Sequence, residues 1–172
     1  MIDFLKTKGI KAYNEIVEIA ERPDLLFSND RDQVDAEARY NHRTIQRLNK
    51  IIKNNKLSLN ELEDILAFVE SAWASYLKKF YAEKTFVFYM WGDYQIPAIR
   101  ISAVSYYEGL GLPFGCIVNQ IDDRKEVLTQ YREKACFDGV PVAESEDLNL
   151  AADDEEENTY ILTMYARIIH AK

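Results

Sequence analysis

Apolar side chains recur at helical spacing through the first half of the chain. The first such segment covers residues 2–20, and Pro23 should stop it near Glu21, because proline lacks the amide hydrogen that a helix interior requires. A second helix is predicted to begin near residues 30–32 and to end at Asn54-Asn55. Its apolar stripe consists of Val34, Ala38, Ile45, Leu48 and Ile52.

The third helix has the clearest start signal in the chain. Ser58 is followed three residues later by Glu61, which is the pattern of a capping box, and an apolar run follows at once. The helical period then continues from Leu62 to Phe80. We expect this segment to be the central helix of the core.

After Lys84 the pattern changes to β-branched and aromatic residues. Residues 85–91, the turn Gly92-Asp93 and residues 95–104 predict a β-hairpin. Pro97 has no amide hydrogen for a strand ladder, so the second strand is expected to be an edge strand, to be bulged, or to begin after Pro97.

The remaining pattern predicts a strand over residues 114–121, a short helix over residues 123–134 capped by Asp122, and a last strand over residues 159–169. The last strand is apolar on both faces, which favours a central place in the sheet. We therefore expect the α+β class, with three N-terminal helices packed on a mainly antiparallel sheet of about four strands. One domain is predicted over residues 1–172, with a helical half of about 1–83 and a strand-rich half of about 84–172.

Composition places the chain among soluble globular proteins, since 48% of its residues are hydrophobic and 29% are charged. No stretch is apolar enough to span a membrane, and the first residues do not resemble a secretory signal. Cys116 and Cys136 match no metal-binding or redox spacing. A cytoplasmic protein with reduced thiols is the expectation.

Motifs for catalysis and for cofactors are absent from the sequence. His42 and His170 have no partners at ligand spacing, so neither predicts a metal site. Nucleophile elbows, phosphate-binding loops and dinucleotide fingerprints are missing. The glycine-rich residues 109–115 run into a predicted strand and are interpreted as a turn. We predict no cofactor.

Charge is the most informative feature of the sequence. The net charge is −8, yet residues 138–158 hold nine acidic residues and no lysine or arginine, which leaves 21 basic and 20 acidic residues in the rest of the chain. Such a run is most often a solvated loop, but it also suits a basic partner, because concentrated negative charge steers cationic proteins. The acidic residues are Asp138, Glu144, Glu146, Asp147, Asp153, Asp154, Glu155, Glu156 and Glu157.

Aromatic residues gather at the predicted hairpin and in the loop after it. Their positions are Tyr89, Trp91, Tyr94, Tyr106 and Tyr107. Tyrosine and tryptophan are enriched at interface hot spots, but they are equally normal in a half-buried sheet. They are candidate anchors for a partner.

The second predicted helix has a basic side. Arg39, Arg43, Arg47 and Lys50 fall roughly opposite its apolar stripe. Such a helix can bind phosphates or nucleic acid, and a solvent-exposed helix face also carries polar residues without any such role.

Three hypotheses follow from these patterns. The first is an acidic protein-binding module that neutralises a basic partner, of which the immunity or inhibitor protein of a bacterial nuclease toxin is the physical type. In that role Asp147 and the acidic run at residues 153–157 would meet the partner, with the hairpin aromatics as anchors. The second is a nucleic-acid- or nucleotide-binding module that uses the basic helix. The third is an enzyme with a site near the hairpin, built from residues such as Asp93, Tyr94, Arg100 and Glu108.

Overall fold

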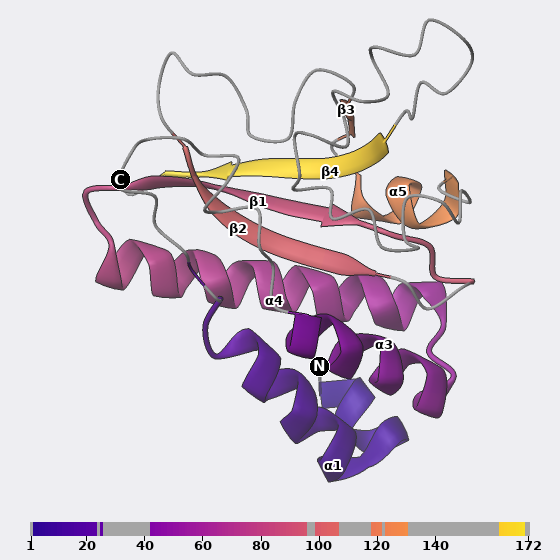
Figure 1. The fold of residues 1–172 in the computed structure, drawn as a ribbon. Coiled ribbons are helices and arrows are strands. Elements are labelled where there is room, and N and C mark those ends of the chain that lie inside the picture. The colour runs from indigo at the N-terminus through magenta and orange to yellow at the C-terminus, as the bar shows by residue number, and fades with distance from the viewer. Residues whose placement is uncertain are drawn as a thin grey trace, which may run out of the picture.

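The structure is a computed structural model that describes residues 2–23, 25, 42–95, 99–106, 118–121, 123–130 and 162–170 (Figure 1). It belongs to the α+β class, as expected from the sequence. The described helices are α1 (Ile2–Ala20), α3 (His42–Asn55), α4 (Leu59–Phe80) and α5 (Arg124–Gln130). The strands are β1 (Thr85–Trp91), β2 (Arg100–Tyr106), β3 (Val118–Ile121) and β4 (Leu162–Ile169).

Helices α1 and α3 end where the sequence predicts. Helix α1 ends at Ala20, three residues before Pro23, and α3 ends at Asn55. Helix α1 contains a kink at Gly9, whose backbone has a φ of 85°. This left-handed conformation favours glycine, because a Cβ atom would clash with the backbone there. The predicted start of the second helix and the first part of its apolar stripe lie outside the described residues.

The capping box at the start of α4 is confirmed. The Ser58 side chain accepts a hydrogen bond from the backbone amide of Glu61, and the Glu61 carboxylate accepts one from the backbone amide of Ser58. These two bonds satisfy donors that have no partner inside the helix. The apolar face of α4 is buried from Leu62 to Leu77, and its buried apolar residues are Leu62, Ile65, Leu66, Val69, Trp73 and Leu77.

The four strands form one mixed sheet with the order β2-β1-β4-β3. Strand β1 is antiparallel to both β2 and β4, whereas β3 runs parallel to β4. Strand β4 lies between two others, which confirms its predicted central place. Strand β2 begins at Arg100, after Pro97, and lies at the edge of the sheet, so the lack of an amide hydrogen at Pro97 interrupts no pairing in the described ladder.

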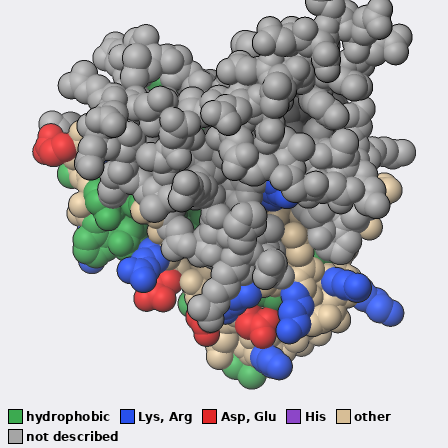
Figure 2. Space-filling model, in the orientation of Figure 1, with side chains coloured by type: hydrophobic (Ala, Val, Ile, Leu, Met, Phe, Trp, Pro, Cys, Tyr) green, Lys and Arg blue, Asp and Glu red, His purple; other side chains and the backbone are tan. Residues whose placement is uncertain are grey.

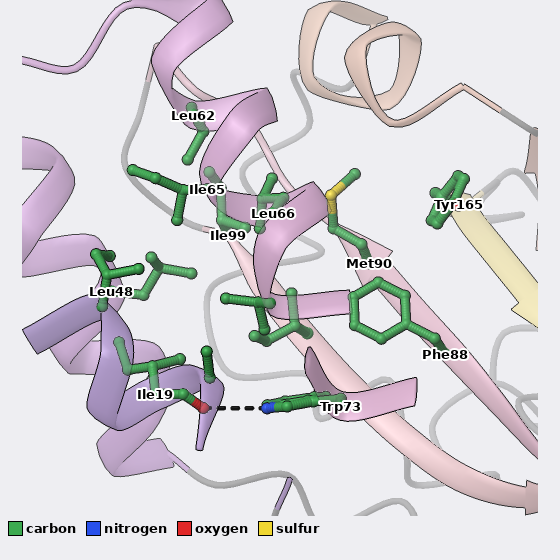
Figure 3. Packing of buried hydrophobic residues seen from close by; sticks show 14 of the residues in the cluster. Ile19, Leu48, Leu62, Ile65, Leu66, Trp73, Phe88, Met90, Ile99 and Tyr165 are labelled. Atoms are coloured by element: carbon green, nitrogen blue, oxygen red, sulfur yellow. Dashed lines mark hydrogen bonds between the residues drawn. The ribbon is translucent and has the colours of Figure 1, made fainter. Parts of the chain in front are cut away.

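Helix α4 lies against the sheet, and α1 and α3 pack on the side of α4 that faces away from the sheet (Figure 1). Trp73 links these layers, because its indole nitrogen donates a hydrogen bond to the carbonyl oxygen of Ile19 at 3.0 Å while its ring meets Phe88 of β1 edge to face (Figure 3). The described N-terminal helices α1, α3 and α4 are therefore stacked in layers, and of these only α4 lies along the sheet.

Helix α5 differs from its predicted start. The Asp123 side chain accepts a hydrogen bond from the backbone amide of Lys125 at 2.8 Å, which is the bond of a helix cap, whereas the predicted cap Asp122 lies outside the described residues. The helix packs against α4 and β4 and contributes Val127 and Leu128 to the core. None of the helices in the described ranges is long and apolar enough to cross a bilayer.

The register gives the sheet two different faces. Phe86, Phe88 and Met90 face α4. Val87, Tyr89 and Val104 are also buried, but they alternate with those residues and lie on the opposite face. No helix in the described part of the chain packs on that second face.

Candidate functional site

Glu70 is a carboxylate on the buried face of α4, only 4% exposed. It lies between Leu66 and Trp73 in the helical repeat, at a position where an apolar residue is the rule. A charge at such a position is costly unless it is paired and hydrogen-bonded. Its partners come from two distant parts of the chain.

Three side chains donate hydrogen bonds to the Glu70 carboxylate. The Tyr165 hydroxyl of β4 lies 3.0 Å from Oε2 and 3.2 Å from Oε1. Arg167, also on β4, donates from Nη1 to Oε1 at 3.1 Å. Arg124 of α5 donates from Nη1 to Oε2. The lone pairs of Glu70 are thus engaged by donors that α5 and β4 supply.

Arg124 joins this cluster to a second carboxylate. Its Nε and Nη2 atoms each lie 2.9 Å from Oε1 of Glu63. Glu63 precedes Glu70 by two turns of α4, so both residues lie on the same face of the helix. Its Nη1 atom also donates to the Tyr165 hydroxyl at 3.0 Å, and its guanidinium lies 5.0 Å from the centre of the Tyr165 ring. Because Asp123 caps α5, Arg124 is the first residue of that helix and its position is set by the cap.

The cluster shifts the pKa of several members. Burial and the charge of Glu70 raise the pKa of the Tyr165 hydroxyl, so it stays protonated and donates. Burial opposes the charge on Arg124, but the bonds to Glu63 and the charge of Glu70 outweigh it and raise the pKa of Arg124. The charge of Glu70 also raises the pKa of Arg167. Burial raises the pKa of Glu63, whose Oε2 atom has no hydrogen-bond partner among the described residues.

A groove of about 490 Å³ opens beside this cluster, between α4 and the end of β4. Arg124, Arg167 and Lys78 supply three positive charges to its walls, and Glu70 supplies one negative charge. Arg167 keeps 67% of its side-chain surface exposed although it is bound to Glu70. The other lining residues are Ala67, Ser71, Ala74, Ile168, Ile169 and His170.

This arrangement suits binding of an anion better than proton transfer. The Glu70 carboxylate already accepts from three donors, so it has little capacity left to act as a general base. Guanidinium groups, by contrast, offer several donors in a planar fork that matches carboxylates and phosphates. The described ranges contain no group of three His, Cys, Asp or Glu side chains placed to hold a metal ion.

The aromatic residues predicted as partner anchors are dispersed in the structure. Tyr89 is fully buried on the second face of the sheet, and burial raises the pKa of its hydroxyl. Tyr94 follows β1 and is partly buried against the core, while Tyr106 ends β2 and is partly exposed. Trp91 ends β1, but its side chain lies outside the description, as does Tyr107.

The predicted acidic contact residues also lie outside the described part of the chain. They are Asp147, Asp153, Asp154, Glu155, Glu156 and Glu157. Cys116 and Cys136 lie outside it too. The role of the acidic residues therefore stays a prediction.

The predicted basic side of α3 is partly paired within the protein. Arg47 forms an ion pair with Glu18 of α1, whereas Lys50 is exposed. Arg39 lies outside the described residues, and Arg43 lies in α3 with a side chain that is not described. On the face drawn in Figure 2, Lys and Arg side chains lie beside Asp and Glu side chains in the region of α1 and α3.

Glu70, Arg124, Tyr165 and Arg167 were not among the residues that the sequence singled out. A weak signal existed, because Glu70 interrupts the apolar stripe of α4 and Arg167 interrupts an apolar strand. Nothing in the sequence pairs them, since Glu70 and Arg167 are 97 residues apart. Only the packing of β4 beside α4 and α5 brings the cluster together.

Comparisons of the chain with models of known protein families, with curated proteins and with solved structures find no match.

Proposed function

We propose that this protein is an acidic binding module that neutralises a basic protein partner. The observation that carries the proposal is the charge distribution: nine acidic residues and no basic one in residues 138–158, beside 21 basic and 20 acidic residues elsewhere. The excess of negative over positive charge thus lies in one short segment.

Concentrated charge of this kind acts mainly on association. A negative segment raises the local concentration of a cationic partner and speeds encounter by one to three orders of magnitude at low salt. The effect weakens as salt rises, because the screening length is about 8 Å at physiological ionic strength. Binding should therefore be fast and strongly dependent on salt.

The charges on the described helices are consistent with a recognition role for the acidic segment. Arg47, a member of the predicted basic side of α3, is engaged by Glu18. Lys and Arg side chains lie near Asp and Glu side chains over the helical layer in the view of Figure 2. Helix α3 carries four basic residues and no acidic one, which is a smaller local excess than the nine acidic residues of 138–158. This difference favours the acidic segment as the recognition element.

The specific class that we propose is the immunity or inhibitor protein of a bacterial nuclease toxin. Nucleases bind phosphates through basic surfaces, and a run of carboxylates can occupy such a surface in place of nucleic acid. Tyr94 and Tyr106, which are partly exposed near the two ends of the hairpin, are suited to pack at the rim of that contact. The partner in this proposal is a basic toxin domain.

The test begins with capture of the partner from host cells and continues with two variants of equal charge. In the first, Asp153, Asp154, Glu155, Glu156 and Glu157 are replaced by Asn or Gln. In the matched control, five acidic residues of the described surface are replaced in the same way, namely Asp3, Glu21, Asp64, Glu83 and Glu126. Both variants lose five negative charges, so only the position of the charge differs.

We expect the association rate with the captured basic protein to fall by about tenfold or more in the first variant and far less in the control. Equal effects in both variants would mean that net charge alone acts, and unchanged binding in the first would remove the acidic segment from recognition. Capture of nucleic acid in place of a protein would overturn the proposal and favour a role for the basic side of α3.

A further inference from the structure

The groove beside Glu70 has a charge opposite to that of the whole protein. Its walls carry three cations, Arg124, Arg167 and Lys78, and one carboxylate, in a chain whose net charge is −8. A neighbouring groove of about 510 Å³ near the start of β1 shows a different balance, since Glu83 and Lys84 offset each other there. The positive excess belongs to the first groove.

Glu70 places the two arginines in that wall. The buried carboxylate binds Nη1 of Arg124 and Nη1 of Arg167, so neither guanidinium swings freely. A donor that is already oriented loses less conformational freedom when a ligand binds. Arg167 is the more accessible of the two, because its side chain is 67% exposed and that of Arg124 is 15% exposed.

Lys78 completes the positive wall from a different element. It lies two helical turns after Ser71 on α4, and both residues line the groove together with Ala67 and Ala74. Its ammonium is a flexible point charge, whereas the guanidinium of Arg167 is a rigid fork. Together with Arg167 it offers two cationic groups that a ligand can approach from solvent.

We propose that this groove binds the phosphate group of a small phosphorylated molecule. A phosphate monoester carries more negative charge than a carboxylate and presents three acceptor oxygens. This suits a wall whose three cations outnumber the two carboxylates, Glu63 and Glu70, that bind its arginines. The groove volume of about 490 Å³ falls in the range of small-molecule sites, so it holds more than a free ion. Ala67 and Ala74 of α4 provide apolar surface for the rest of the ligand.

The site is separate from the acidic segment and does not depend on the proposed partner. The test is calorimetric titration of the full chain with inorganic pyrophosphate and with adenosine monophosphate at low salt. Succinate serves as a dicarboxylate whose charge is similar to that of adenosine monophosphate. We expect saturable binding of one phosphorylated probe per chain and weaker binding of succinate.

Two variants and a neighbouring control locate the site. Lys78→Gln and Arg167→Gln should each weaken binding of the phosphorylated probe by about tenfold or more, the usual effect of losing a charge-assisted hydrogen bond. Lys79→Gln makes the same change of charge one residue away, outside the groove lining, and should alter the affinity by no more than about twofold.

Arg167→Gln removes a bond to Glu70 and could disturb β4. Lys78→Gln does not have this side effect, because none of the described contacts of the cluster involves Lys78. The Lys78 variant therefore keeps the test decisive. The proposal is overturned if neither phosphorylated probe binds at millimolar concentration, if Lys78→Gln and Lys79→Gln weaken binding equally, or if succinate binds as tightly as pyrophosphate.

Discussion

Glu63 and Glu70 show how two carboxylates on one helix face come to have different roles. Both bind Arg124, and they are separated by two turns of α4. Glu70 accepts bonds from three side chains. Glu63 accepts from Arg124 through one oxygen, while its other oxygen is buried without a partner among the described residues. The cost of burying a carboxylate is therefore better offset at Glu70 than at Glu63.

The raised pKa of Glu63 has a consequence for stability. Burial raises the pKa of Glu63 in the folded protein above its unfolded value, so folding favours the protonated carboxyl group. Its contribution to stability is fully present below the unfolded pKa and is lost as the pH rises through the folded pKa. We expect the free energy of unfolding of the unmodified protein to fall, relative to that of Glu63→Gln, as the pH rises through the raised pKa of Glu63.

Denaturation by urea at several pH values checks this expectation. Ser75→Ala is a suitable reference, because the residue is exposed on the same helix and does not titrate. Its difference from the unmodified protein should be constant with pH. A constant difference for Glu63→Gln as well would show that Glu63 does not couple folding to proton binding.

Helix α4 is the element on which the rest of the fold depends. One side packs on β1 through Trp73 and Phe88, and the same indole bonds to α1 through the Ile19 carbonyl oxygen. Its start is defined by Ser58 and Glu61, and a Ser58 bond lowers the pKa of Glu61. The position at which the helix begins decides which of its residues face the sheet. The cap therefore helps to determine which side chains enter the core.

Replacing Ser58 by alanine should destabilise the protein by about 1 kcal/mol, because the amide of Glu61 loses its acceptor. The measurement is the urea midpoint, with an unchanged slope if two-state unfolding is retained. Ser75→Ala in the same helix is the matched control and should change stability by less than about 0.5 kcal/mol. Equal losses for the two serine variants would show that the capping box adds nothing to stability.

On the scale of the whole molecule, the Glu70 cluster connects three elements that are distant in sequence. It joins α4 to α5 through Arg124 and to β4 through Tyr165 and Arg167. Removing one partner of a buried ion pair leaves the other charge uncompensated. The cluster should therefore hold α5 and β4 in place against α4.

Glu70→Ala should lower the free energy of unfolding by about 3 kcal/mol or more, because Arg124 and Tyr165 lose their shared acceptor. Hydrogen exchange should also become faster in α5, which is a short helix of 7 residues. Glu83→Ala removes an exposed carboxylate from the turn after α4 and should cost less than about 0.5 kcal/mol. A Glu70 variant as stable as the Glu83 variant would show that the cluster is not needed for the fold.

The sequence predicted local features better than spatial ones. The Ser58 capping box, the stop before Pro23 and the delay of β2 until after Pro97 follow from steric and hydrogen-bonding rules within a few residues. At the start of α5 the local signal was ambiguous, because aspartate is a good cap at both 122 and 123, and the structure shows the capping bond at Asp123. The parallel pairing of β3 with β4 has no local signal.

The candidate site shows the same limit more sharply. Arg47 belonged to a predicted basic surface, and the tertiary structure pairs it with Glu18. Glu70 and Arg167 each interrupt an apolar pattern, but nothing in the sequence indicates their partners or links them to Arg124. Their association depends on contacts between residues separated by 54 and 97 positions, which no periodicity encodes.

What the sequence determined by itself is the α+β class, the type of the described elements, the central place of the last strand and the concentration of acidic charge at residues 138–158. Hydrophobic period, caps and prolines act over short distances, so they can be deduced without a fold. The tertiary structure alone decided that α4 lies along the sheet with α1 and α3 behind it, and that Glu70 gathers two arginines beside a groove. Ion pairing and groove shape depend on which distant surfaces pack together, and packing is a property of the whole chain.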